Sequence, residues 1–169
     1  YTDVGTIIAA NHRDYQEGDV VILKPRYGKY INNFRAGGFV YGCVRFLGDE
    51  GKGGVPQLYD PGDCILAKVD MGDNKIIPKG GRVLVKRDGY MKEYGALALP
   101  DGVGNRSGEA LVMAVSSDAH DVQVGDTVIC HAGSFDRAML PQELADAYGC
   151  SYKDLAFIDE TSIYAVIER

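Results

Sequence analysis

The sequence contains no tryptophan, only six prolines and three histidines, and no clustered run of lysine and arginine. Its 169 residues carry a net charge of -6, whereas a general nucleic-acid binder usually shows a basic patch or stripe. No uninterrupted apolar stretch is long enough to span a bilayer, and no stretch has the composition of a signal peptide. We therefore expect no nucleic-acid partner and no membrane partner.

The four cysteines are scattered and form no Cys-x-x-Cys pair: Cys43, Cys64, Cys130 and Cys150. A zinc site would need tighter clustering, and scattered thiols suit a reducing compartment better than a disulfide framework. Cys130-His131 is the one adjacent Cys/His pair, which a thiol at a strand end beside a turn histidine explains. No Gly-x-Ser-x-Gly nucleophile motif occurs. We expect a cytoplasmic protein that is not an enzyme and has no cofactor and no metal.

Glycine is abundant, and the 22 glycines separate short runs rich in valine and isoleucine. This pattern predicts an all-β fold with tight turns between the strands. Only residues 140–149 have the pattern of a helix, with Pro141 near the first turn and Gly149 at the end. Leu140, Leu144 and Ala147 would lie on its buried face.

A long connection, Asp88–Ser107, separates two segments that have strand patterns. The first, Arg82–Lys86, has apolar residues between polar ends and predicts a half-buried strand, whereas the almost unbroken apolar run Glu109–Val115 predicts a strand buried on both faces. The connection is longer than most in compact domains, yet its centre is apolar. Exposed apolar residues on such a loop are best explained as a binding peptide.

The centre of this loop, Gly95-Ala96-Leu97-Ala98-Leu99-Pro100, resembles the mobile loop of the GroES-type co-chaperonins, in which paired glycines precede an aliphatic tripeptide. Three other segments fit the family in the same order. Residues 84–87 resemble its opening strand, 124–129 its central Val-Gly-Asp strand, and 158–168 its closing segment. The resemblance covers roughly residues 76–169.

The resemblance implies a co-chaperonin that caps a GroEL-type chaperonin ring, forms a ring itself and assists ATP-dependent folding. It assigns chaperonin binding to residues 95–100, with Leu97-Ala98-Leu99 entering an apolar groove of the chaperonin. It also implies that Asp88–Ser107 is disordered until it binds. The alternative is a structural or binding module of the same fold, for example phage-encoded, that caps no chaperonin. An enzyme of the related alcohol-dehydrogenase fold would need zinc ligands, which are not visible.

An internal repeat predicts one and a half copies of this fold. The matching segments are Gly5–Ala10 with Gly108–Ala114, Glu17–Ile22 with Val124–Ile129, and Pro61–Val69 with the segment that ends at Ile167. We expect tandem, partly open GroES-like β-barrels with short helical or Gly-rich insertions. Residues 1–70 would be a partial domain without its opening strand and mobile loop, and residues 75–169 a complete one.

Each copy has a Gly-Asp pair before its central strand, Gly18-Asp19 and Gly125-Asp126. Glycine can adopt positive φ in a turn, and aspartate can bond the backbone two residues further on, so we interpret both acids as structural. The preceding connections are short, whereas many co-chaperonins carry a β-hairpin there that roofs the ring. We therefore expect no roof in this protein.

Two further segments give predictions about strand pairing. Within the Gly-rich residues 32–55 we favour a hairpin with strands in Phe39–Phe46 over a second mobile loop. Cys64–Val69 and Lys75–Ile77 are separated by five residues that suit a tight hairpin. That hairpin would turn the family's strand pair between subunits into one within the chain. The closing strand Ile163–Ile167 would then be an unpaired edge, which proteins rarely leave exposed.

Overall fold

The structure is a computed structural model. It describes residues 3–7, 13–24, 34–36, 39–41, 44–46, 56–58, 65–87, 93–94, 97–98, 108–131 and 133–167. For residues 34–58 and 93–98 of this set, only the backbone is described.

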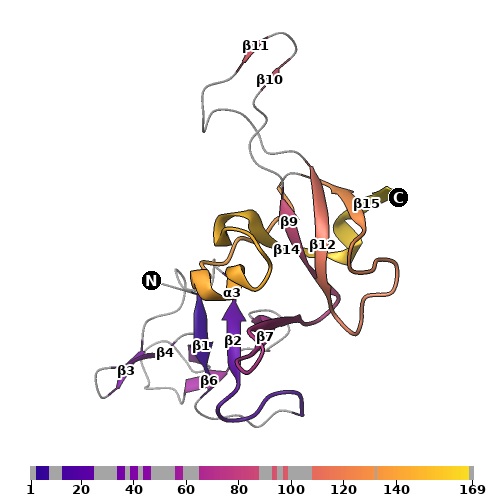
Figure 1. Ribbon diagram of the computed structural model, residues 1–169. Helices are drawn as coiled ribbons and strands as arrows, with labels where there is room; N and C mark the ends of the chain where they lie inside the picture. Colours follow the sequence, from indigo (N-terminus) through magenta and orange to yellow (C-terminus); the bar gives the residue numbers. More distant parts are fainter. Residues whose placement is uncertain are drawn as a thin grey trace.

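Two antiparallel sheets make up most of the described chain (Figure 1). The first contains β1 (Val4–Thr6), β2 (Val20–Leu23), β7 (Ile65–Asp70) and β8 (Lys75–Pro78), in the order β1-β2-β7-β8. The second contains β9 (Arg82–Arg87), β12 (Glu109–Val115), β13 (Thr127–Cys130), β14 (Leu155–Asp159) and β15 (Ile163–Ile167), in the order β14-β9-β12-β13-β15. Two 3₁₀ turns, η1 (Tyr152–Asp154) and η2 (Glu160–Ser162), flank β14. The predicted all-β class is confirmed.

Two pairs of short strands lie in and directly after the Gly-rich residues 32–55. β3 (Phe34–Ala36) pairs with β4 (Phe39–Tyr41), and β5 (Val44–Phe46) pairs with β6 (Pro56–Leu58). The prediction of one hairpin inside Phe39–Phe46 is therefore wrong in its pairing, because β4 and β5 each pair with a strand outside that segment. Two glycines separate β3 from β4 in the sequence, which is a typical hairpin connection.

The predicted helix is present but shorter than expected. Helix α3 (Gln142–Asp146) begins directly after Pro141, and Gly149 has a φ of 63° three residues beyond its end. Leu144 is buried as predicted, but Ala147 is exposed and Ala145 is buried instead. Helix positions 144 and 145 thus face the core.

The main hydrophobic core joins the two sheets. Ile22, Leu66 and Ile76 come from the four-stranded sheet, while Leu84 and Phe157 come from the five-stranded sheet. The segment before α3 is bonded to the residue that precedes β1, because Asp3 accepts from the backbone N–H of Met139 (2.7 Å) and donates its own N–H to the Met139 carbonyl (2.8 Å). The two sheets therefore form one packed body.

Strand β9 is buried on both of its faces. Leu84 lies in the main core, while Val83 and Val85 lie in a second core with Val112 and Val128. Its neighbour β12 alternates buried and more exposed residues. The burial predicted for the two strands was therefore wrong in both cases, because β9 lies between β14 and β12 and packs against both cores.

The two Gly-Asp turns have the same geometry. Gly18 and Gly125 have φ values of 89° and 93°. The Asp19 carboxylate accepts the backbone N–H of Gln16, and Asp126 accepts that of Gln123, both at 2.9 Å. The predicted positive φ is confirmed, but the aspartates bond the backbone three residues earlier rather than two residues on.

The strands that follow these turns also correspond in register. In β2–β7 the partners are Val20↔Val69, Val21↔Lys68 and Ile22↔Ala67, with a register shift before Leu23. In β13–β15 the partners are Thr127↔Ile167, Val128↔Val166 and Ile129↔Ala165, with a register shift before Cys130. For the strands that precede these turns, β1 and β12, the sequence repeat matched Gly5 with Gly108. The strand pairing instead makes Gly5 equivalent to Ala110, two residues further along.

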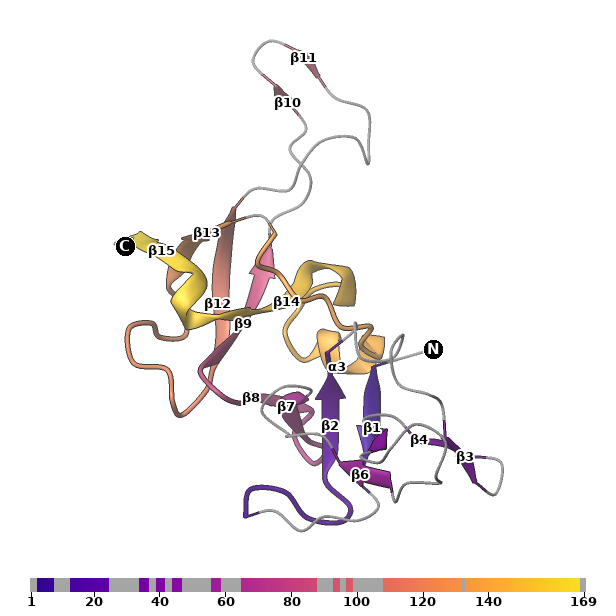
Figure 2. The ribbon, with the colours of Figure 1, turned by 180° about the vertical axis from the view of Figure 1, so that it is seen from behind.

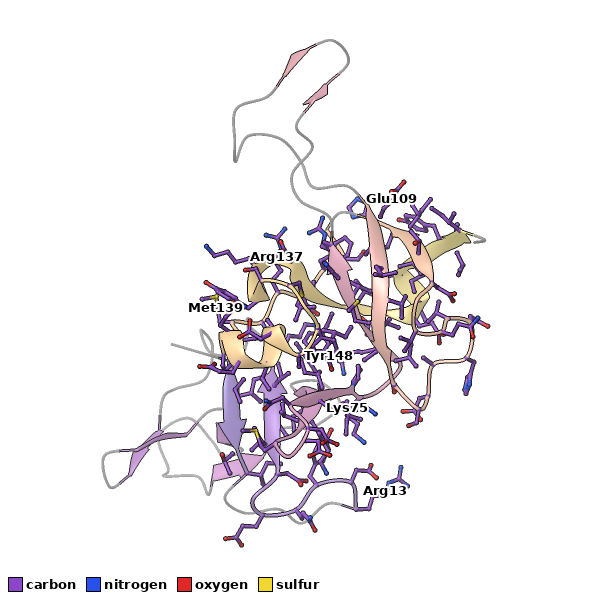
Figure 3. The ribbon with its side chains drawn as sticks, viewed as in Figure 1. Arg13, Lys75, Glu109, Arg137, Met139 and Tyr148 are labelled. Atoms are coloured by element: carbon purple, nitrogen blue, oxygen red, sulfur yellow. The ribbon has the colours of Figure 1, made fainter. Side chains whose placement is uncertain are left out.

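The predicted β7–β8 hairpin is confirmed, with Val69 opposite Ile76. On the outer side of β8, the hydroxyl of Tyr148 accepts the N–H of Ile76 (2.8 Å) and donates to its carbonyl (3.4 Å). Figure 3 labels Tyr148 beside the helical segment, near Lys75 of β8. A side chain thus satisfies the edge of this strand, as buried backbone groups require.

Replacing Tyr148 with Phe should therefore lower the free energy of unfolding by about 1–3 kcal/mol, because it leaves the Ile76 N–H without its acceptor. Urea denaturation of the purified protein measures this loss. Tyr164→Phe is the matched control, since Tyr164 is 72% exposed and should lose almost nothing. Equal stability of the two variants would contradict this role of Tyr148.

The first Gly-Asp turn carries an ion pair. Asp19 lies 2.6 Å from Nζ of Lys68 on β7. Burial acts to raise the pKa of Asp19, but the Lys68 ammonium and the Gln16 N–H outweigh it and hold that pKa below its ordinary value of 3.8. A lowered folded-state pKa stabilises the protein above the unfolded pKa, and the contribution is lost as the pH falls through the folded pKa.

Replacing Asp19 with Asn keeps an acceptor for Gln16 but removes the charge. We expect a loss of less than about 1 kcal/mol at pH 7, which fades as the pH is lowered below about 4. Thermal melts of wild type, Asp19→Asn, Lys68→Met and the double variant measure it as a cycle. A loss that stays constant between pH 7 and pH 3 would show that the charge is not responsible.

Candidate functional site

A small hairpin lies inside the long connection between β9 and β12. β10 (Glu93–Tyr94) pairs with β11 (Leu97–Ala98), with Glu93 opposite Ala98 and Tyr94 opposite Leu97. Both ribbon views show this hairpin apart from the two sheets, beyond the ends of β9 and β12 (Figures 1 and 2). The structure thus carries an apolar strand on an arm that is separate from the packed body.

The predicted site residues fall into two groups. Leu97 and Ala98 form β11, whereas Gly95, Ala96, Leu99 and Pro100 lie outside the described residues. Residues 93–94 and 97–98 are paired with each other, and the disorder expected for Asp88–Ser107 before binding stays a prediction. An isolated pair of such short strands is marginal in water, so local opening costs little free energy.

Both ends of the connection are held by the five-stranded sheet. Arg87, the last residue of β9, lies opposite Ala110 of β12 and is 2% exposed. Its guanidinium carbon is 3.7 Å from the centre of the Phe135 ring. Such a contact is well within the range of a cation–π interaction. Sequence reasoning missed this pair, because the two residues are far apart in the chain.

Gly108 begins the return into β12. Its carbonyl accepts the backbone N–H of Cys130 at 2.9 Å and the Cys130 thiol at 3.4 Å. A Cβ at position 108 would lie 2.5 Å from the Cys130 carbonyl oxygen, so only glycine fits without a shift. Burial raises the pKa of the Cys130 thiol, against the opposing effect of the Arg87 charge. This thiol is structural rather than nucleophilic.

Strand β15 is the second exposed feature, at the edge of the five-stranded sheet near the C-terminus (Figure 2). Tyr164, Val166 and Ile167 are all at least 40% exposed. The Asp126 carbonyl accepts the backbone N–H of Val112 on β12. Because the backbone N–H and C=O of successive strand residues point to opposite neighbours, those of Thr127 point toward β15 and those of Val128 point toward β12. Val166, opposite Val128, therefore turns its N–H and C=O outward from the sheet.

A cavity of about 510 Å³ opens where the two sheets meet, with Ile77, Met113, Val115 and Val124 in its lining. Its lining is mostly apolar and gathers no group of catalytic side chains. Among the residues that the structure describes, no three His, Cys, Asp or Glu side chains gather as a metal site would require.

The family comparison agrees with this geometry. The model of the chaperonin 10 Kd subunit matches residues 75–167, which run from β8 to the end of β15 and exceed half of the chain. The chain belongs to the chaperonin-10 family. No curated protein matches it. The matched residues nearly coincide with the range 76–169 expected from the sequence, and the GroES-like all-β fold is confirmed.

Membership supports a co-chaperonin-type function. Chaperonin-10 proteins are in general non-enzymatic, act with a GroEL-like chaperonin ring and form oligomers. Within the matched range, residues 116–126 form turns and no strand. The hairpin that roofs many co-chaperonins is thus missing from this connection. None of the described helices is long and apolar enough to cross a membrane.

Proposed function

We propose that this chain caps a GroEL-type chaperonin ring and assists ATP-dependent folding through residues 95–100. The observation that carries the proposal is the β10–β11 hairpin, which presents Leu97 and Ala98 away from both sheets. Leu97-Ala98-Leu99 would enter an apolar groove of the chaperonin, and strand β11 already has an extended backbone that suits a groove.

The energetics favour many weak contacts over one strong contact. Burying two leucine side chains yields about 3–6 kcal/mol, at roughly 1.5–3 kcal/mol each. Ordering the rest of the loop takes back about 2–5 kcal/mol. A single loop would therefore bind weakly, and affinity would come from several loops on one ring. Weak single contacts also allow release in each chaperonin cycle.

Replacing Leu97 with Asp should abolish binding to a purified GroEL-type double ring, measured by pull-down with and without ATP. The reason is that a carboxylate cannot enter an apolar groove without a large desolvation cost. Circular dichroism should stay unchanged, because β11 lies apart from the core.

Leu111→Asp is the matched control for this substitution. Leu111 is 39% exposed on β12 and lies opposite Lys86, so the same change falls on the sheet surface and should leave binding intact. Retained binding of Leu97→Asp would show that the loop is not the contact.

We also propose that residues 1–70 are a partial first copy of the fold and that residues 75–169 are the complete copy. Three correspondences support this: the identical Gly-Asp turns, the equal registers of β2–β7 and β13–β15, and the register shift at the same place in both. In this arrangement β8 occupies the outer edge of β7, while β15 is the counterpart of β7.

Self-association would use the edge of β15. Val166 turns its backbone groups outward, and the neighbouring side chains Tyr164 and Ile167 are exposed and apolar enough to be covered by a second copy. Edges of this kind template the addition of a strand. Repeating one such head-to-tail contact closes a ring when its rotation closes.

Val166→Pro should abolish self-association, measured by light scattering at fixed protein concentration, because it removes the outward N–H without breaking the β13–β15 ladder. Val166→Thr has nearly the same shape and keeps the N–H, so it should associate like wild type. Oligomers of unchanged size in Val166→Pro would rule out this edge as the contact.

The alternative is a binding or structural module that does not cap a chaperonin. The missing roof hairpin between β12 and β13 favours it, because a ring of such subunits leaves its centre uncovered. The pull-down separates the two functions. Wild type that fails to bind a chaperonin ring with or without ATP would support the module.

A further inference from the structure

We propose that Arg87 and Phe135 position the chaperonin-binding loop, by holding the last residue of β9 so that the loop leaves the sheet in one direction. The inference rests on the proposed function and names two residues that lie outside residues 95–100. Neither is expected to touch the chaperonin.

The contact at the β9 end is unusual in its burial. Arginine at the rim of a sheet, next to a long connection, ordinarily carries its charged head into water. Arg87 instead lies under the Phe135 ring, 2% exposed and 3.7 Å from the ring centre. A desolvated stack of this kind is among the stronger cation–π contacts. It ties the point where β9 ends to a residue from another part of the sheet.

Phe135 is itself held in place. The next residue, Asp136, exchanges two backbone hydrogen bonds of 2.8 Å with Phe157 of β14. Asp136 also forms an ion pair of 3.1 Å with Lys24, at the end of β2. The backbone next to Phe135 is therefore tied to both sheets, while its ring packs against the second core and stacks on Arg87.

The return end has an independent anchor of its own. Gly108 bonds Cys130 through its carbonyl and leaves no room for a Cβ. Figure 3 shows the adjacent Glu109 at the end of β12 nearest to the β10–β11 hairpin. The two anchors lie close together, since Arg87 is opposite Ala110, two residues from Gly108. Together they fix both ends of the connection.

These anchors matter for the direction in which the loop leaves the sheet more than for the length of the loop. Fraying of one or two strand pairs would lengthen the loop by only a few residues, and loop-closure entropy grows slowly with length. Several loops that must reach one chaperonin ring at once are more sensitive to geometry. Avidity falls sharply when the linked sites cannot be spanned together.

The test compares Phe135→Leu with Phe135→Tyr, which keeps the ring face. We expect Phe135→Leu to bind a purified GroEL-type ring up to about thirtyfold more weakly in ADP, the fold-change that corresponds to losing a desolvated cation–π contact. Amide exchange should speed up at Arg87 and Ala110 but not at Val128 of β13. Phe135→Tyr should keep both the affinity and the exchange rates of the wild type. Tyr152→Leu is the matched control, because it removes a looser stack with Lys153 (5.9 Å).

Two results would overturn the positioning role. One is wild-type affinity in Phe135→Leu, and the other is faster exchange throughout β13, which would mean general destabilisation. If Phe135→Leu does not fold, Arg87→Lys replaces it, since lysine keeps the charge but has no planar head to stack. Binding that survives Leu97→Asp would remove the proposed function. Binding lost in Leu97→Asp but unchanged in Phe135→Leu would remove only the positioning role.

Discussion

The burial of β9 between two hydrophobic cores is the constraint on which the other parts depend. Consecutive residues of this strand, Leu84 and Val85, belong to different cores, so the strand contributes side chains to both. The strand before it, β8, pairs in the other sheet. The short connection between them therefore holds the two sheets together, and Arg82 reinforces it by donating to the carbonyls of Ile65 and Lys79. Each side of the loop inherits its position from this strand and its neighbour β12.

The sequence was informative wherever a local rule decides the structure. The two Gly-Asp turns, the β7–β8 hairpin and the glycine after α3 all follow from backbone preferences of a few residues. Burial was harder to predict, because it depends on which elements pack over a strand. β9 has polar residues at both ends, yet Arg82 and Arg87 are buried through long-range contacts that its own pattern does not contain.

The candidate site shows the same division. The length and apolar centre of the connection pointed to a binding loop, and Leu97 and Ala98 do lie on an arm apart from the sheets. The anchors at its two ends were not foreseen, because Phe135 and Cys130 are remote in sequence from Arg87 and Gly108. The pairing of β10 with β11 was also missed. Glycine between two short segments that can pair was the signal that could have found it.

The matched register shift in the two sheets has a consequence for folding. β7 and β15 pair with their neighbours in nearly the same register, but among the described strands only β7 has a further strand, β8, on its outer side. During folding, β8 can add to β7 of its own molecule or to β15 of another, and the second choice is a domain swap. The hydroxyl of Tyr148 bonds β8 in its place beside β7. This hydrogen bond holds β8 in its intramolecular position from the side opposite to β7, in addition to the strand pairing itself.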